Sequence, residues 1–200
     1  MHANRLLFAA AAGLAVESLV FAEQVHGSGV AVVRAPVPRP VAGVDALVTS
    51  TPGLGLVVLS ADCLGVLLVD PAAGVAAAAH AGRQGLASGV LQATLAVMGE
   101  LGATEVGTTA VLGPAACGRC YELPAELADE VEAAVPGGRS TTREGTPAVD
   151  LAAGAAGLLR SQGVRALRAV GGCTIEQPGM LFSYRRSGRT GRHAAFVRLA

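Results

Sequence analysis

The feature that most constrains this chain is a series of three apolar runs separated by short breaks. Residues 55–60, 64–69 and 75–79 consist almost entirely of alanine, valine, leucine and glycine. Runs of four to eight apolar residues between turn-forming residues are typical of strands buried on both faces. We therefore expect three central strands, with further layers of structure covering both of their faces.

The rest of the chain predicts a mixture of helices and strands. Apolar residues from Leu86 to Leu101 recur at the helical period, and Gly102 follows as a stop signal. The predicted helices are residues 4–13, 86–101, 124–135 and 151–162, and the predicted further strands are residues 19–25, 30–34, 45–49, 106–112, 166–171 and 194–199. Residues 35–40, 139–146 and 184–192 are predicted to be loops.

These elements favour one α+β domain covering residues 1–200. Strands come partly in direct succession and partly in alternation with helices, so we expect mixed sheets with the helices on the outside. No repeat or linker divides the chain. With 15 basic and 15 acidic residues the formal net charge is zero, which argues against nucleic acid as a partner.

The cysteines and the first residues bear on the compartment. Four cysteines in a chain with a large apolar fraction predict thiols in a reduced cytosol rather than a disulfide scaffold. The apolar residues 6–16 followed by residues 20–22 imitate a secretion signal, but their helical spacing favours a short helix. No apolar run approaches the roughly 20 residues that cross a bilayer, so we expect no membrane partner.

Three soft ligands stand at the ends of apolar runs. They are His26, Cys63 and His80, and one thiolate with two imidazoles suits a zinc ion that keeps a fourth position open. Asp62 beside Cys63 is an acid that we assign to the same site, because carboxylates commonly orient metal-bound histidines. A nucleophilic pair of Cys63 and His80 is the alternative.

A second cluster lies in residues 113–122, which contain a Cys-x-x-Cys motif at Cys117 and Cys120. The motif alone is compatible with a redox pair, with half of a zinc site or with a purely structural loop. We favour a loop beside the substrate, with Cys120, Tyr121 or Glu122 in contact with it.

A third cluster is the arginine-rich segment 182–192. Guanidinium groups match phosphate oxygens, so Arg185, Arg186 and Arg192 are candidate phosphate ligands. A solvated loop without a ligand is the alternative for this segment taken by itself.

Taken in order, these motifs resemble the multicopper polyphenol oxidase, or laccase-like, family, whose bacterial members are also described as purine nucleoside phosphorylases and peptidoglycan editing factors. The resemblance spans nearly the whole chain. The matching pieces are Gln24-Val25-His26-Gly27, Asp45-Ala46-Leu47-Val48-Thr49, Ala61-Asp62-Cys63, His80-Ala81-Gly82, Gly113-Pro114, Cys120-Tyr121-Glu122, Asp150-Leu151, Cys173-Thr174, Phe182-Ser183-Tyr184-Arg185-Arg186 and Gly191-Arg192.

The resemblance implies an α/β/β/α sandwich and zinc held by His26, Cys63 and His80. It also implies phosphorolysis of adenosine, inosine, guanosine and methylthioadenosine, with adenosine deamination. We expect a cytoplasmic monomer or small homo-oligomer. In this hypothesis zinc lowers the pKa of a water towards about 7, the arginine loop holds phosphate, and Glu122 or a cysteine protonates the departing base.

The chain departs from the family pattern at three places. The family usually continues His-Ala-Gly with Trp-Arg-Gly, whereas this chain has Arg83-Gln84-Gly85, which leaves Arg83 as the candidate substrate-binding arginine. The family also has an N-terminal segment with a Thr-Arg-x-Gly-Gly-like motif, and this chain begins after it. Cys117 replaces a glycine.

Three other functions remain open from the sequence. A His₂Cys site also suits copper, which would fit a phenol oxidase. Amide hydrolysis on a peptidoglycan precursor would use the same zinc or Cys63. The departures around Arg83 are also compatible with a member that binds a nucleotide without turnover.

Overall fold

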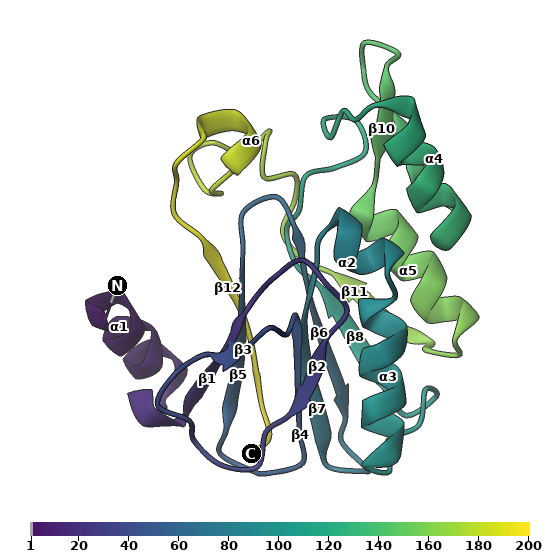
Figure 1. Cartoon of the computed structure of the whole chain (residues 1–200). Coiled ribbons are helices and arrows are strands. Elements are labelled where there is room, and N and C mark those ends of the chain that lie inside the picture. The colour runs from purple at the N-terminus through teal and green to yellow at the C-terminus, as the bar shows by residue number, and fades with distance from the viewer. Residues whose placement is uncertain (1) are drawn as a thin grey trace.

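The computed structural model describes residues 2–200 and forms two facing sheets with helices outside them (Figure 1). The helices are α1 (His2–Ala12), α2 (Arg83–Ala87), α3 (Val90–Glu100), α4 (Ala125–Ala134), α5 (Leu151–Ser161) and α6 (Tyr184–Ser187), with the 3₁₀ turn η1 (Val16–Ser18). The strands are β1 (Leu19–Glu23), β2 (Val30–Val32), β3 (Val41–Ala42), β4 (Ala46–Thr49), β5 (Gly55–Ser60), β6 (Leu64–Asp70), β7 (Val75–Ala81), β8 (Thr109–Leu112), β9 (Arg139–Thr141), β10 (Pro147–Val149), β11 (Ala166–Ala169) and β12 (His193–Arg198).

Ten of the twelve strands form two mixed sheets, while β9 and β10 form a separate two-stranded antiparallel sheet. The six-stranded sheet has the order β11-β8-β6-β7-β4-β2, and the four-stranded sheet has the order β12-β5-β1-β3. In Figure 1, α2, α3 and α5 cover one outer side, while α1 covers the other. The predicted α+β class with an α/β/β/α arrangement and external helices is therefore confirmed.

Alternation along β5 shows how the sequence specifies these layers. Leu56 and Val58 pack between the sheets, whereas Val57 contributes to the cluster below α1 and Leu59 packs against it. Because successive side chains of a strand point to opposite faces, an entirely apolar strand is buried on both sides. This explains the continuous apolar run.

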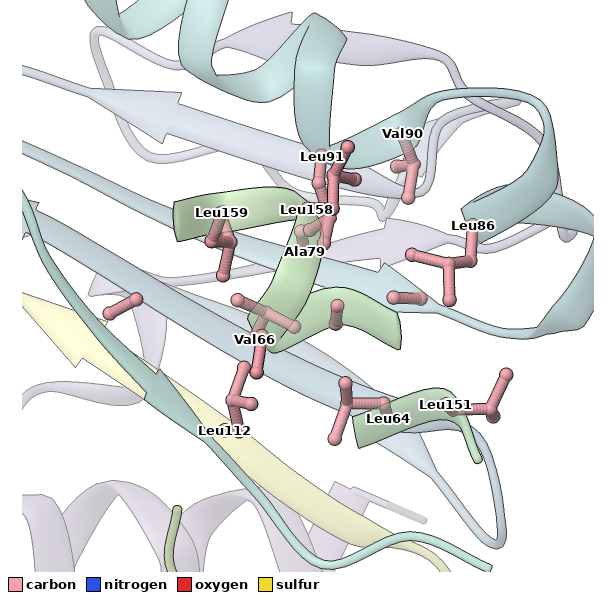
Figure 2. Packing of buried hydrophobic residues seen from close by; sticks show 14 of the residues in the cluster. Leu64, Val66, Ala79, Leu86, Val90, Leu91, Leu112, Leu151, Leu158 and Leu159 are labelled. Carbon is pink, nitrogen blue, oxygen red and sulfur yellow. The ribbon is translucent and has the colours of Figure 1, made fainter. Parts of the chain in front are cut away.

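The outer helical layer packs against the six-stranded sheet. Figure 2 shows Leu64, Val66 and Ala79 of the sheet beside leucines of the helices, which are Leu86, Leu91, Leu151, Leu158 and Leu159. All of these side chains are buried. In β7, Ala77 and Ala79 belong to this cluster while Ala78 packs between the sheets, so the same alternation directs His80 away from the helices.

Several local predictions differ from the structure. The predicted helix 86–101 is broken at Gly89, whose left-handed φ of 90° separates α2 from α3. The predicted strand 106–112 begins only at Thr109, because Val106 is exposed. The polar segment 139–146 contains β9, which pairs with β10 in an antiparallel hairpin.

The N-terminal and C-terminal thirds show two further differences. The strand predicted over residues 19–25 ends at Glu23, which leaves His26 in a turn. The arginine-rich loop contains α6, which Ser183 caps by accepting a hydrogen bond from the backbone N–H of Arg186. None of the helices described within residues 2–200 is both long and apolar enough for a bilayer crossing.

Candidate metal centre and substrate cavity

The structure brings His26, Cys63 and His80 together from three separate elements. His26 lies in the turn after β1, Cys63 lies in the turn between β5 and β6, and His80 lies in β7. One ligand atom from each residue lies within 4.8 Å of the other two. The two imidazole rings stand edge to face with their centroids 4.9 Å apart. The three side chains thus share one point between the two sheets.

Asp45 holds this arrangement, and the sequence analysis did not assign it to the site. Its buried carboxylate lies 2.8 Å from Nδ1 of His80 and accepts hydrogen bonds from the backbone N–H groups of His26 at 3.0 Å and Gly27 at 2.7 Å. Because Nδ1 of His80 is occupied, its Nε2 is the nitrogen that remains for a metal. The position of Asp45 directly before β4, which pairs with β7, is the signal that could have identified it.

Two non-glycine residues of the site have left-handed backbones. They are His26 with φ of 62° and Asp62 with φ of 86°. Residues other than glycine adopt this region uncommonly, with asparagine, aspartate and histidine the most frequent, and such backbone outliers cluster at functional sites. Asp62 is buried, and its two oxygens accept hydrogen bonds from the hydroxyl of Thr174 and from the backbone N–H of Arg185. Asp62 therefore fixes the α6 loop beside Cys63.

The space around the three ligands fits a metal ion. A Cβ added to Gly82 would lie 3.0 Å from the Cys63 sulfur, 3.2 Å from Cδ2 of His26 and 3.7 Å from Cε1 of His80. Zinc bonds of about 2.0–2.3 Å place tetrahedral donors roughly 3.4–3.8 Å apart, and the three donor atoms here lie within 4.8 Å of one another. Gly82 leaves free the space that the ligands need for this.

The protonation of the ligands also fits a metal and disfavours a nucleophilic cysteine. Burial, together with the charges of Asp62 and Asp45, raises the pKa of the Cys63 thiol to about 11, so without a cation this side chain is a neutral thiol and a weak nucleophile. Burial lowers the pKa of His80 and keeps its imidazole neutral, as metal binding requires. Burial alone would raise the pKa of Asp45, but hydrogen bonds from His80 and Gly27 outweigh it and lower this pKa.

The three ligands open into a cavity of about 540 Å³, a volume typical of small-molecule sites. The cavity combines apolar walls with several positive charges. Its lining includes the predicted site residues Asp62, Arg83, Tyr121, Arg185 and Arg192, and also Gln24, Leu59, Ser60, Ala61, Gln84 and Tyr184.

The cavity arginines are held in different ways. Arg185 lies over the ring of Tyr121 at 4.6 Å and donates a hydrogen bond to the backbone oxygen of Glu122. Arg83, the first residue of α2, forms an ion pair with Glu130 of α4, with a nitrogen-to-oxygen distance of 3.1 Å. Within residues 2–200, the guanidinium of Arg192 donates only to carbonyl groups of its own loop, so it keeps donors for a ligand.

Three predicted site residues do not line this cavity. Glu122 is exposed and faces a separate depression beside Pro124. Cys120 lies with Cys117 in another cluster. The guanidinium of Arg186 donates to the backbone oxygens of Thr174, Ile175 and Leu181 and so supports the surrounding loops.

The four cysteines within the described residues are free thiols, as the sequence predicts for this chain.

A family model described as "Multi-copper polyphenol oxidoreductase laccase" matches residues 1–200. The chain belongs to this laccase-like family. The family that the sequence motifs indicate is therefore confirmed.

Relatives within the laccase-like family cover nearly the whole chain. Proteins named purine nucleoside phosphorylase from Mycobacterium tuberculosis and from Streptomyces coelicolor are each 50% identical to it, over 98% of this chain and 78% or 81% of their own lengths. Two solved structures also match 98% of the chain. YlmD from Geobacillus stearothermophilus has a TM-score of 0.89 at 28% identity, and a Neisseria meningitidis protein has a TM-score of 0.86 at 34% identity, with 78% and 79% of their chains covered.

Proposed function

We propose that this protein is a zinc-dependent purine nucleoside phosphorylase that cleaves inosine, guanosine, adenosine and methylthioadenosine and also deaminates adenosine. The observation that carries the proposal is the meeting of His26, Cys63 and His80 at the base of a cavity lined by arginines. The names of the relatives at 50% identity support the same reaction class.

In phosphorolysis, an oxygen of phosphate attacks C1′ of the ribose while the bond to the purine nitrogen breaks. The electron pair of that bond stays with the base, which takes up a proton, and the products are the free purine and ribose 1-phosphate. Two needs follow for the protein. It must hold an anion at one end of the cavity and supply a proton at the other.

Arg185 and Arg192 are our candidates for the phosphate site. Both line the cavity and both belong to the arginine-rich segment 182–192, and planar guanidinium groups bind phosphate oxygens in pairs. Arg83 adds positive charge from α2, although its ion pair with Glu130 engages part of its guanidinium.

Tyr121 replaces Glu122 as the proton donor in our proposal. Its ring lines the cavity, and burial, partly opposed by Arg185, raises the pKa of its hydroxyl. The phenol therefore stays protonated at neutral pH and is able to donate to the departing base. The exposed Glu122 has no such position.

A zinc ion held by His26, Cys63 and His80 would supply Lewis acidity and would lower the pKa of a water molecule to about 7. That chemistry suits adenosine deamination, in which water adds at C6 of the purine and ammonia leaves. Asp45 contributes by holding His80 through Nδ1, and Asp62 contributes by fixing the backbone of Arg185.

The test is incubation of the zinc-loaded protein with inosine and phosphate. We expect hypoxanthine and ribose 1-phosphate in equal amounts, and inosine with ammonia when adenosine is given without phosphate. Tyr121→Phe should lower kcat for phosphorolysis with little change in zinc content. Absence of both reactions, together with oxygen uptake on a phenol by copper-loaded protein, would replace our proposal with the oxidase that the family description suggests.

A further inference from the structure

A second group of soft ligands lies outside the cavity. Cys117, Cys120, Cys173 and Glu176 each place a ligand atom within 4.8 Å of the others. None of these four residues lines the cavity that contains His26. Three thiols and a carboxylate make up a complete set for a tetrahedral metal.

The spacing of the four residues has the form of two matched pairs. Cys117-x-x-Cys120 and Cys173-x-x-Glu176 both place two ligands three positions apart. The first pair forms a tight turn, because the backbone N–H groups of Cys120 and Tyr121 both donate to the oxygen of Cys117 at 2.9 Å. Turns of this kind bring a Cys-x-x-Cys pair onto one ion.

The two pairs are joined by backbone and sulfur contacts. Ala115 and Cys173 form a parallel bridge, and the N–H of Thr174 donates to the oxygen of Ala115 at 3.0 Å. The N–H of Cys117 donates to the Cys173 sulfur at 3.4 Å, and the Cys120 thiol donates to Glu176 at 3.2 Å. The four ligands are therefore positioned by the backbone before any ion binds.

The surrounding charges suit a bound cation with this ligand set. Three thiolates, one carboxylate and a divalent ion would leave two negative charges. Arg143 donates to the Cys120 sulfur at 3.3 Å and forms an ion pair with Glu176, and Arg119 adds a positive charge nearby. These guanidinium groups offset the excess negative charge without supplying a competing ligand.

A disulfide explains the cluster less well. Any disulfide among Cys117, Cys120 and Cys173 would leave the third thiol unpaired and would give Glu176 no role. Zinc binding uses all four groups, and the proton that Cys120 now shares with Glu176 would be released.

We propose that Cys117, Cys120, Cys173 and Glu176 form a second, structural zinc site. The site is closed, since the protein supplies four ligands, and it has no open position for chemistry. It joins the loop that carries Tyr121 to the loop whose Thr174 binds Asp62 and whose carbonyl groups bind Arg186. A zinc ion here would hold two walls of the cavity in register.

The test is the zinc content of purified, reduced protein by native mass spectrometry, together with absorption after cobalt substitution. We expect two metal ions per chain, one for each cluster. Cys117→Ser and Glu176→Gln should each lower zinc affinity at the second site by about tenfold or more, while the first ion stays bound. The matched variant Cys63→Ser should lose the first ion, keep the second and retain most of the thiolate-to-cobalt absorption.

The measurement does not depend on catalytic activity, so it separates this site from the proposed phosphorolysis. Glu176→Gln alters an exposed side chain and leaves every thiol in place, so it should fold even where a cysteine variant does not. A wild-type protein that binds a single ion which Cys63→Ser abolishes, or variants at Cys117 and Glu176 that both retain two ions, would overturn the proposal. A disulfide within the cluster under reducing conditions would do the same.

Discussion

The sharpest test of the metal centre is Gly82→Ala. Gly82 precedes α2 with φ of −75° and ψ of 173°, a conformation that alanine adopts without strain. The only new feature is a methyl group 3.0 Å from the sulfur of Cys63 and 3.2 Å from the ring of His26. The substitution therefore acts on the geometry of the ligands and not on the backbone.

The size of the effect follows from these contacts. Carbon atoms are in best contact at about 3.5–4.0 Å, so the two ligands must move by roughly 0.5 Å to accept the methyl group. Metal sites tolerate departures of only about 0.2 Å in bond length. We expect zinc affinity to fall by about 10- to 100-fold, the loss that follows when the supports of a metal ligand are removed.

Zinc affinity should be measured by competition with a chromophoric chelator, and the stability of the metal-free protein by urea unfolding. Gly99→Ala is the matched control, because a Cβ at Gly99 in α3 meets nothing within 4 Å. That control should keep wild-type affinity and gain about 0.5–1 kcal/mol of stability from the better helix propensity of alanine. A Gly82→Ala protein that binds zinc as tightly as the wild type would refute the reasoning.

Three further predictions address the surroundings of the site and the stability of the fold. Asp45→Asn removes the charge that holds His80, so zinc affinity should fall about 10- to 100-fold in the same chelator assay; an unchanged affinity would remove Asp45 from the site. Arg192→Gln should raise KM for phosphate by about 10- to 100-fold with little change for the nucleoside, whereas Arg189→Gln in the same exposed loop should change neither. Asp70→Asn should cost about 1–3 kcal/mol at pH 7, because backbone hydrogen bonds from Thr104, Ala73 and Ala72 lower the pKa of this buried carboxyl. The Asp70 carboxylate stabilises the fold above the unfolded-state pKa of about 4, and this contribution is lost as pH falls through the lower pKa of the folded state. The free energies of unfolding of wild type and variant should therefore converge in acid. A difference that stays constant with pH would contradict this reasoning.

The sequence predicts the central part of the fold well because that part depends on local patterns. The apolar runs of β5, β6 and β7 require burial on both faces, and ligands that interrupt such runs must lie at the ends of strands or in turns. This reasoning was sufficient to nominate His26, Cys63 and His80. It needed no knowledge of how the strands pair.

The sequence could not show the placement of residues whose surroundings depend on tertiary contacts. Asp45 looks like an ordinary polar residue before a strand, and only the folding of a turn 18–20 positions earlier onto its carboxylate reveals its part. Nothing in the local pattern of Cys120-Tyr121-Glu122 indicates which of the three residues faces the cavity. A tight turn directs Tyr121 inward and leaves the other two outside it.

The same difficulty separates Arg185 from Arg186. Both belong to α6, yet one lines the cavity and the other donates to three backbone oxygens of neighbouring loops. Adjacent positions of a helix point about 100° apart, so a cluster of arginines in sequence is not a cluster in space. Composition alone could not divide their roles.

The central claim is that one cation is held jointly by His26, Cys63 and His80. Anomalous diffraction at the zinc edge from crystals of zinc-loaded protein tests it most directly. We predict a peak about 2.3 Å from the Cys63 sulfur and about 2.0–2.1 Å from a nitrogen of each histidine. Crystals that contain zinc but show no anomalous peak between these three side chains would contradict the claim.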